Sequence, residues 1–280
     1  MITLPDLIIE PIVRTALAED LGRAGDITSH ACVEPGAQLA ASFGARKAGV
    51  VAGLDCARLA IHVLDPAARF EIEAPDGAAV QFGTVLARAE ANARALLSAE
   101  RVALNLLGRL SGIATLTRAY VDAVAGTGAT ITDTRKTTPG LRALEKYAVR
   151  CGGGVNHRFG LDDAILIKDN HVAACGGVGP AIRRARAAAG HLVKIEAEVD
   201  SLGQLDEALA EGPDVIMLDN FSLTDLAAAV ARAKGRAVLE ASGGVTLETV
   251  RAIAQSGVDV ISVGALTHSA PALDIGLDAG

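Results

Sequence analysis

The sequence predicts an α/β protein: an open (β/α) barrel preceded by an N-terminal α+β domain. From residue 129 onward, short apolar runs alternate with helical patterns, and the last four runs start at residues 192, 214, 237 and 258. This spacing is typical of a repeated βα unit, in which a crossover helix joins parallel strands. A doubly wound sheet would alternate in the same way. Polar residues recur where each run ends, which favours a barrel, because the active-site rim of (β/α) barrels lies at that end.

The first hundred residues lack this repeat and mix helical and β-type patterns. A helix is expected at 6–20, ending at Gly22, and another at 54–64. The β-type runs of this part lie at 38–52, 69–73 and 84–90. The six barrel runs lie at 129–132, 164–167, 192–197, 214–218, 237–241 and 258–263. We therefore expect an α+β arrangement first and the barrel after it.

A long helical pattern joins the two parts. It starts near Asn92, is expected to break or kink at Ser111-Gly112, and resumes to Val124. We place the domain boundary at this break. Residues 1–112 then form the N-terminal domain, which residues 267–280 are expected to join, and residues 113–266 form the barrel.

Composition limits the classes of partner. Half of the 280 residues are hydrophobic, with two Tyr, five Phe and no Trp, so the core is aliphatic. No apolar run approaches the roughly 18 residues that a membrane helix needs, and no signal segment begins the chain, so a soluble, cytoplasmic protein is expected. A net charge of −7 and few aromatic residues argue against nucleic acid. The four cysteines are scattered and show no zinc-type spacing.

One segment of this acidic chain is cationic. From Arg135 to Lys168 the sequence has seven Lys or Arg and three Asp or Glu. Arg135 and Lys136 follow an apolar, β-branched run and precede Thr-Thr-Pro-Gly, so we expect them at a strand end and turn rather than on a helix. Together with His157, Arg158 and Lys168 they suit carboxylates or phosphates, which arginine can bind bidentately.

Carboxylates end the next strands. Glu198 and Asp219 suit ribose hydroxyls or a Mg²⁺ ion that carries a phosphorylated ligand. Strand alternation puts Lys194, Glu196 and Glu198 on one face. Glu196 ranks below Glu198 because Lys194 or a rim cation could be its only partner.

Glycine-rich turns end the last two predicted strands. Ser242-Gly243-Gly244 and Gly264 lie where barrels commonly bind phosphate through backbone N–H groups. With the cations and carboxylates they describe a site for two anionic ligands, at least one of them a phosphorylated sugar. The alternative is that the charges form an internal salt-bridge lattice across the rim.

Several long motifs in order resemble those of a known family. They are Asp133-Thr134-Arg135-Lys136-Thr137-Thr138-Pro139-Gly140, Asn156-His157-Arg158, Lys168-Asp169-Asn170-His171, Glu196-Ala197-Glu198, Asp219-Asn220, Ser242-Gly243-Gly244 and Gly264-Ala265-Leu266-Thr267-His268, with Glu100-Arg101 upstream. The chain resembles the quinolinate phosphoribosyltransferase family, also called nicotinate-nucleotide pyrophosphorylase (carboxylating), along nearly its whole length.

The resemblance implies an activity and a set of site residues. The family transfers the phosphoribosyl group of phosphoribosyl pyrophosphate (PRPP) to quinolinate with Mg²⁺, releasing pyrophosphate and CO₂ and giving nicotinate mononucleotide for NAD synthesis. The quinolinate carboxylates would contact Arg101, Arg135, His157, Arg158 and Lys168, and Lys136 would reach either substrate. Glu198 and Asp219 would serve the ribose and Mg²⁺, and Ser242, Gly243, Gly264 and His268 the phosphates. Catalysis would rest on Lys136, Lys168, Glu198 and Asp219.

The resemblance also implies a homodimer, in which Arg101 enters the site of the neighbouring subunit. Three other functions stay open. A related protein of molybdenum-transport gene clusters shares the general pattern, although Lys168-Asp169-Asn170-His171 and the full cation set favour the biosynthetic enzyme. A Schiff-base aldolase could use Lys168. A non-catalytic barrel could bind a phosphosugar, but it has no need for five cations around a second anion.

Overall fold

The computed structural model describes residues 3–233 and 235–280, which form two compact units. The first, which we call the N-terminal unit, contains Met1–Arg118, Thr137–Gly153 and Leu266–Gly280. The second, the barrel unit, contains Ala119–Lys136 and Gly154–Ala265. The chain therefore passes between the units at several points along its length. None of the described helices is both long and apolar enough to cross a lipid bilayer.

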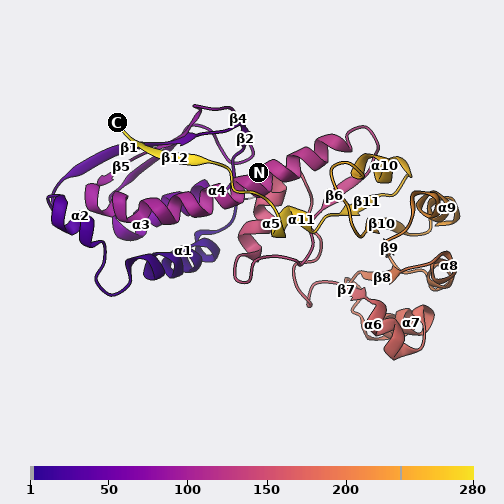
Figure 1. The fold of residues 1–280 in the computed structure, drawn as a ribbon. Helices are drawn as coiled ribbons and strands as arrows, with labels where there is room; N and C mark the ends of the chain where they lie inside the picture. Colours follow the sequence, from indigo (N-terminus) through magenta and orange to yellow (C-terminus); the bar gives the residue numbers. More distant parts are fainter. Residues whose placement is uncertain (1–2, 234) are drawn as a thin grey trace. The chain divides into compact units, whose positions relative to one another are not determined.

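An antiparallel sheet forms one layer of the N-terminal unit (Figure 1). Its strand order is β12-β1-β5-β3, with bounds Ile275–Ala279, Gln38–Ala45, Val85–Asn92 and Arg69–Ile72. The last strand of the chain, β12, thus pairs with the first, β1. A second, two-stranded sheet pairs β2 (Gly49–Val50) with β4 (Ala79–Val80), so the expected run at 38–52 is two strands.

Helices α1 (Asp6–Leu21), α3 (Leu54–Leu64) and α4 (Ala93–Ala123, to Arg118 in this unit) supply the other layer (Figure 1). The unit also contains α2 (Ile27–Cys32), α5 (Arg142–Cys151) and all of α11 (Ala265–His268) except Ala265. The apolar faces of α3 and α4 are completely buried at Leu54, Ile61, Leu96, Leu107 and Leu110, and Phe43 of β1 is buried as well. The aliphatic core expected from composition is therefore confirmed.

The expected break at Ser111-Gly112 is wrong, because α4 continues through both residues. The glycines of this helix instead allow close packing. A Cβ on Gly112 would lie 2.0 Å from the carbonyl oxygen of Pro271, and one on Gly108 would lie 2.9 Å from that of Leu273. Leu273 also donates its N–H to the Gly108 carbonyl at 2.9 Å. Gly108 and Gly112 therefore form a flat surface on which the C-terminal segment lies.

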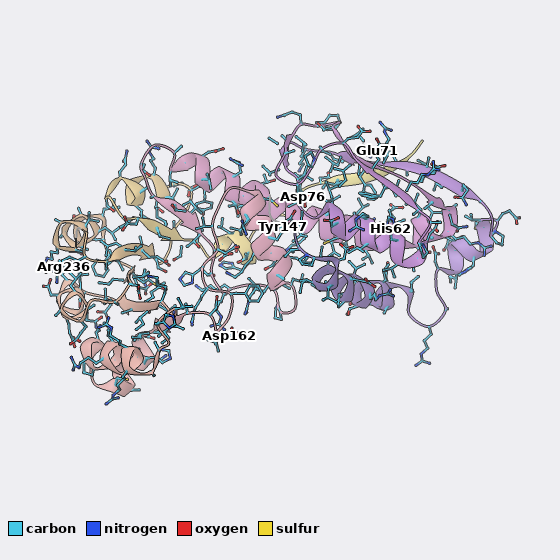
Figure 2. The ribbon with its side chains drawn as sticks, turned by 180° about the vertical axis from the view of Figure 1, so that it is seen from behind. His62, Glu71, Asp76, Tyr147, Asp162 and Arg236 are labelled. Carbon is cyan, nitrogen blue, oxygen red and sulfur yellow. The ribbon has the colours of Figure 1, made fainter. Side chains whose placement is uncertain are left out.

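A partly buried carboxylate, Asp76, ties α5 to the start of α3. Asp76 accepts the backbone N–H groups of Gly53 and Leu54 at 2.9 and 3.2 Å, and the Tyr147 hydroxyl at 2.8 Å. Figure 2 labels Asp76 and Tyr147. Burial raises the pKa of Asp76, and the hydrogen bonds partly oppose this. The first-turn N–H groups of α3, which have no partner within the helix, are satisfied in this way.

Six parallel strands form the sheet of the barrel unit (Figure 1). They are β6 (Thr130–Thr132), β7 (Ile165–Ile167), β8 (Ile195–Val199), β9 (Val215–Asp219), β10 (Val238–Ser242) and β11 (Val260–Ser262). The order is β6-β11-β10-β9-β8-β7, so β6 and β7 are the two edges and the barrel is open. The intervening helices are α6 (Asp169–Cys175), α7 (Val178–Ala188), α8 (Leu202–Glu211), α9 (Leu223–Ala233) and α10 (Val250–Gln255). The predicted open (β/α) barrel is confirmed.

The prediction that Lys194, Glu196 and Glu198 share one strand face is wrong for Lys194. Strand β8 begins at Ile195, and the Lys194 side chain is 73% exposed. Its Nζ atom lies 2.6 Å from Oδ1 of Asp214. Glu196 therefore has a different partner, described below.

Candidate functional site

A cavity of about 520 Å³ opens at the carboxyl ends of the barrel strands. Parallel register brings these ends to one edge, since Asp219 pairs with Ser242 and Thr132 with Ser262. We call it the strand-end cavity. Its lining combines cations, carboxylates and neutral groups: Arg135, Lys136, Arg158, Lys168, His157, Glu198, Asp219, Glu240, Thr134, Asn220, Ser242, Ser262, Leu166 and Met217. All of these residues belong to the barrel unit.

The structure brings together eight of the predicted site residues. Arg135, Lys136, His157, Arg158, Lys168, Glu198, Asp219 and Ser242 line the cavity. Gly243 follows Ser242, and Gly264 follows β11 in the same unit. Arg101 on α4 and His268 on α11 are exposed residues of the N-terminal unit. Their predicted roles stay predictions.

A fully buried carboxylate at the end of β6 positions the histidine. Asp133 accepts the backbone N–H of His157 at 2.9 Å through Oδ1 and the Asn156 side-chain amide at 2.7 Å through Oδ2. A carboxylate that accepts N–H groups on both oxygens is well satisfied even without water. Asp133 therefore fixes the Asn156-His157 turn against the barrel strand.

Both ring nitrogens of His157 have partners, and these assign its tautomer. The backbone N–H of Arg158 donates to Nδ1 at 2.8 Å, so Nδ1 is an acceptor. The proton therefore lies on Nε2, which is 3.1 Å from Oε2 of Glu196 and 3.6 Å from Oε1 of Glu240. The imidazole is held on both sides, which leaves it one orientation in the cavity wall.

Glu240 on β10 is an unexpected buried acid of this cluster. Burial, and then the nearby charge of Glu196, raises its pKa to about 7, and His157 partly opposes the rise. Its Oε1 atom, like Oε1 of Glu196, is buried and has no hydrogen-bond partner among the described residues. A proton on Glu240 lowers the cost of placing two carboxylates beside one imidazole.

Two arginines of the cavity lie close enough to affect each other. Burial, and then the positive charge of Arg135, lowers the pKa of Arg158. The Nε atoms of both residues are buried and lack a hydrogen-bond partner among the described residues. Arg158 is oriented by a bond from Nη1 to the Ala164 carbonyl at 3.2 Å. Two neighbouring guanidinium groups with free donors form a site for an anion, above all a carboxylate.

An ion pair joins the cation set to the acids. Nζ of Lys168, at the end of β7, lies 3.0 Å from Oε2 of Glu198 on β8. The backbone N–H of Lys168 donates to Nδ1 of His171 at 2.9 Å, which fixes the turn into α6. Glu198 is 13% exposed, so its charge faces the cavity from a largely buried position. The ion pair holds the Lys168 ammonium group beside Glu198 in the cavity wall.

A strained turn after β9 places Asp219. Asn220 has a φ of 56°, and its backbone N–H donates to the Ser242 carbonyl at 2.9 Å. Its side chain donates to Oδ2 of Asp219 at 2.7 Å. A Cβ on Gly243, whose φ is +96°, would lie 2.1 Å from Oδ1 of Asn220. Only glycine fits here, so the Ser242-Gly243 turn and the Asp219 carboxylate are packed together.

Two groups of residues in the barrel unit have side chains that could hold a metal ion. Glu198 and Asp219 offer partly accessible carboxylate oxygens, the ligands that Mg²⁺ prefers beside a phosphorylated substrate. These residues fit the ion. Ligand atoms of His157, Glu196 and Glu240 lie within 4.8 Å of one another and could also hold a metal. The charges of the two arginines beside this cluster oppose a further cation, which favours the hydrogen-bonded imidazole instead.

Sequence reasoning missed Glu240, gave Asp133 no role although it begins the first family motif, and ranked Glu196 below Glu198. Strand alternation carried a signal, since Glu240 shares a face with Ser242, and Glu196 with Glu198. The sequence could not show that all three acids are buried around one histidine turn.

Known proteins resemble this chain along nearly its whole length. The chain matches the family descriptions "Quinolinate phosphoribosyl transferase, N-terminal domain" over residues 26–111 and "C-terminal domain" over residues 113–278. It is 53% identical to the nicotinate-nucleotide pyrophosphorylase [carboxylating] of Mycobacterium leprae over 95% of each chain. It is 48% identical to a probable nicotinate-nucleotide pyrophosphorylase [carboxylating] of Bacillus subtilis, covering 93% of this chain and 89% of that one.

Solved structures give the same result. NadC from Streptococcus pyogenes superposes with a TM-score of 0.95 at 41% identity, over 100% of both chains. The nicotinate-nucleotide pyrophosphorylase from Francisella tularensis has a TM-score of 0.95 at 39% identity, covering 99% of this chain and 98% of that one. The fold, both domain matches and these identities agree, and the chain belongs to the quinolinate phosphoribosyltransferase family.

Proposed function

We propose that this chain is a pentosyltransferase that transfers the phosphoribosyl group of PRPP to quinolinate, with loss of CO₂ and pyrophosphate, giving nicotinate mononucleotide for NAD synthesis. One observation carries the proposal most directly. Arg135 and Arg158 present buried Nε–H groups that have no hydrogen-bond partner in the described part of the chain, in a cavity that also contains Glu198 and Asp219. The cavity therefore has groups for an aromatic dicarboxylate and for a sugar phosphate. Relatives named for this activity share most of their length with the chain.

The cations bind and orient the pyridine. Each quinolinate carboxylate can be bound bidentately by a guanidinium, and His157 and Lys168 add donors. A dicarboxylate is strongly hydrated in water, so its ring nitrogen is a poor nucleophile there. Fixed cations replace that water and hold the nitrogen toward the ribose, which converts a bimolecular attack into a positioned one.

The carboxylates act on the ribose. As the C1–O bond to pyrophosphate breaks, C1 gains oxocarbenium character, and the charges of Glu198 and Asp219 stabilise it. Backbone N–H groups of the Ser242-Gly243 turn and the Lys136 side chain suit the phosphate oxygens. In the same step the pyridine nitrogen forms its bond to C1 and pyrophosphate leaves with the bonding pair.

Magnesium would be held near Glu198 and Asp219, as the donor set allows. When bound, Mg²⁺ neutralises negative charge on the phosphates of PRPP.

Decarboxylation follows on the pyridinium nucleotide: the bond from the ring to the adjacent carboxylate breaks, CO₂ leaves, and the electron pair stays on the ring carbon until a proton replaces CO₂. Arg135 and Arg158 stabilise this developing negative charge.

The same proposal includes an assembly. We infer a cytoplasmic homodimer in which Arg101 contacts quinolinate in the neighbouring subunit's site. Arg101 is exposed on α4 and so is available to another chain.

Release of labelled CO₂ tests the reaction. Quinolinate labelled in the ring-2 carboxylate is incubated with the enzyme, with and without PRPP and Mg²⁺. We expect CO₂ release only with both. Release without PRPP would show a simple decarboxylase, and PRPP binding without any release would show a non-catalytic phosphosugar barrel.

A further inference from the structure

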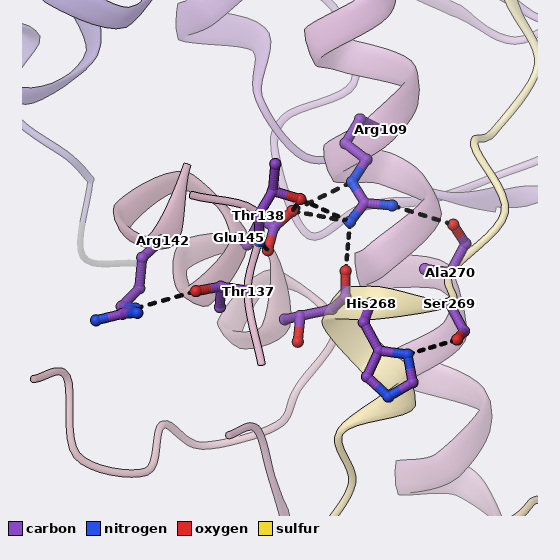
Figure 3. A network of polar contacts seen from close by, with 9 residues as sticks. Arg109, Thr137, Thr138, Arg142, Glu145, His268, Ser269 and Ala270 are labelled. Carbon is purple, nitrogen blue, oxygen red and sulfur yellow. Dashed lines mark hydrogen bonds and ion pairs between the residues drawn. The ribbon is translucent and has the colours of Figure 1, made fainter. Parts of the chain in front are cut away.

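A buried ion pair lies in the N-terminal unit, outside the strand-end cavity. Oε1 of Glu145 on α5 lies 2.8 Å from Nη2 of Arg109 on α4 and 3.2 Å from its Nε atom (Figure 3). The Glu145 side chain is 0% exposed and that of Arg109 26%. Neither residue lines the strand-end cavity.

Glu145 holds the segment that follows Lys136. Its Oε2 atom accepts the backbone N–H of Thr138 at 3.0 Å, and its Oε1 atom accepts the Thr138 hydroxyl at 2.7 Å. Arg142 on the same helix donates from Nε to the Thr137 hydroxyl at 3.0 Å (Figure 3). The two residues after Lys136 are therefore tied to α5 by three hydrogen bonds, where the chain passes from the barrel unit into the N-terminal unit.

Arg109 binds the segment in which the chain returns from the barrel unit to the N-terminal unit, at Leu266. Its Nη2 atom donates to the Thr267 carbonyl, and its Nη1 atom donates to the Ala270 carbonyl at 3.3 Å (Figure 3). These residues flank His268, and Gly264 precedes them by three residues. One guanidinium thus joins α4, the segment after Lys136 and the segment around His268.

Stability alone does not explain this pair. A buried ion pair often contributes no more to stability than two apolar side chains of the same volume would. Apolar side chains, however, do not define the positions of backbone groups. The planar guanidinium and the buried carboxylate do, because the carboxylate binds Thr138 with both oxygens and the guanidinium binds the carbonyls of Thr267 and Ala270. The arrangement therefore sets where two loops begin.

We propose that Arg109 and Glu145 are positioning residues for PRPP: their ion pair fixes the backbone just after Lys136 and on both sides of His268. This rests on the proposed function, which gives Lys136 a phosphate contact, and on the family resemblance, which implies one for His268. Lys136 and His268 both suit phosphate groups. Of the residues proposed for quinolinate, Arg135 precedes Lys136 directly, whereas His157, Arg158 and Lys168 lie on later segments of the barrel unit. Loss of the pair should therefore affect PRPP more than quinolinate.

Four variants test the proposal. Arg109→Met and Glu145→Gln each remove the charge on one partner, and the double variant Arg109→Met/Glu145→Leu replaces the pair by apolar groups. Arg58→Met is the matched control, because the Arg58 side chain is also 26% exposed, is ion-paired with Asp6 and Asp55, and lies in the same unit. The measurements are KM for each substrate, kcat, thermal midpoint, and PRPP affinity by calorimetry.

We expect KM for PRPP to rise roughly tenfold or more in the single variants, from the loss of charge-assisted hydrogen bonds, with KM for quinolinate changing less than about threefold. The double variant should regain thermal stability and still bind PRPP weakly, a combination that a purely structural role would not give. Arg58→Met should keep wild-type KM values. If a single variant does not fold, Arg109→Lys and the double variant carry the test.

Two results would overturn the proposal. One is an unchanged KM for PRPP in folded Arg109 or Glu145 variants, and the other is an equal rise in Arg58→Met. The proposed function fails separately, by absent turnover in the wild type. In that case the PRPP affinities of the four variants still decide whether the ion pair positions a phosphate-binding segment.

Discussion

Nε2 of His157 lies 3.1 Å from Oε2 of Glu196, a strand residue buried to 7% exposure. The contact matters because the opposite ring nitrogen already accepts the N–H of Arg158. Glu196 therefore decides where the one N–H group of the imidazole points. Its effect on substrate passes through His157, so it is a positioning residue.

Replacing Glu196 should weaken quinolinate binding in a graded way. In Glu196→Ala the N–H of His157 loses its acceptor, which costs about 1–3 kcal/mol for a buried group, so KM for quinolinate should rise roughly 10- to 100-fold. Glu196→Gln keeps one acceptor oxygen and should lose less. Steady-state kinetics at fixed, saturating PRPP measures both. Wild-type KM values in Glu196→Ala would refute this role.

Glu240 should make stability fall with rising pH. Its pKa is raised to about 7 in the folded protein from 4.5, so between these values the folded state binds more protons than the unfolded state. The contribution is fully present below pH 4.5 and lost as pH rises through 7, at most about 3 kcal/mol by the usual conversion. Glu240→Gln, which cannot ionise, should be about as stable as the wild type at pH 4 and more stable at pH 8.5.

Thermal midpoints of both proteins at the two pH values measure this difference. Glu71→Gln, at an exposed strand position of the N-terminal unit, is the control and should show no such pH dependence. A midpoint difference between Glu240→Gln and the wild type that is the same at both pH values would contradict the assignment.

Two adjacent glycines offer a paired test of the turn after β10. A Cβ on Gly243 would meet Asn220 Oδ1 at 2.1 Å, whereas one on Gly244, whose φ is +58°, would meet nothing within 4 Å. Gly243→Ala should displace Asn220 and Asp219 and reduce kcat/KM for PRPP about 100-fold or more. Gly244→Ala should cost only about 1 kcal/mol of stability, from its left-handed backbone. Similar kinetics for both variants would show that the close approach is unimportant.

The sequence predicted the parallel strands well because their spacing repeats. Five of the six barrel strands start within one or two residues of the expected position, and polar groups follow them as expected. The exception is the strand expected at 192, which begins at Ile195, because Lys194 belongs to an ion pair outside the sheet. Periodicity reports which residues alternate, but it does not report where a strand begins to pair.

Contacts between distant segments could not be predicted. Ser111-Gly112 reads as a helix break because glycine weakens helices. In the structure only a glycine at position 112 leaves room for the Pro271 carbonyl, some 160 residues later in the chain. The helix stays continuous because this packing stabilises it. Glu240 is similar: its strand reads as apolar, and the charge makes sense only beside His157, which belongs to a different part of the chain. Local patterns carry no information about such pairs.

Mixing two inactive variants tests the predicted dimer. Arg101→Ala and Lys136→Ala chains should each be inactive alone. In a mixed dimer the Arg101→Ala barrel keeps Lys136 and receives Arg101 from its partner, so one of its two sites is complete. With random mixing half of the dimers are mixed, and roughly a quarter of wild-type activity should return, as expected for a two-fold symmetric assembly.

Activity is measured after co-expression, and gel filtration confirms dimers. Subunit exchange without recovered activity would show that Arg101 does not act in trans.

The choice of pyridine substrate tests the account most directly. Arg135, Arg158, His157 and Lys168 together suit two carboxylates, and a monocarboxylate would leave desolvated positive charge without a counter-charge. The measurement is turnover of wild-type enzyme with PRPP and Mg²⁺ and either quinolinate or nicotinate, followed by the nucleotide formed. We predict nicotinate mononucleotide from quinolinate, with CO₂ released in equal amount, and no nucleotide from nicotinate. Equal turnover of nicotinate would contradict the account.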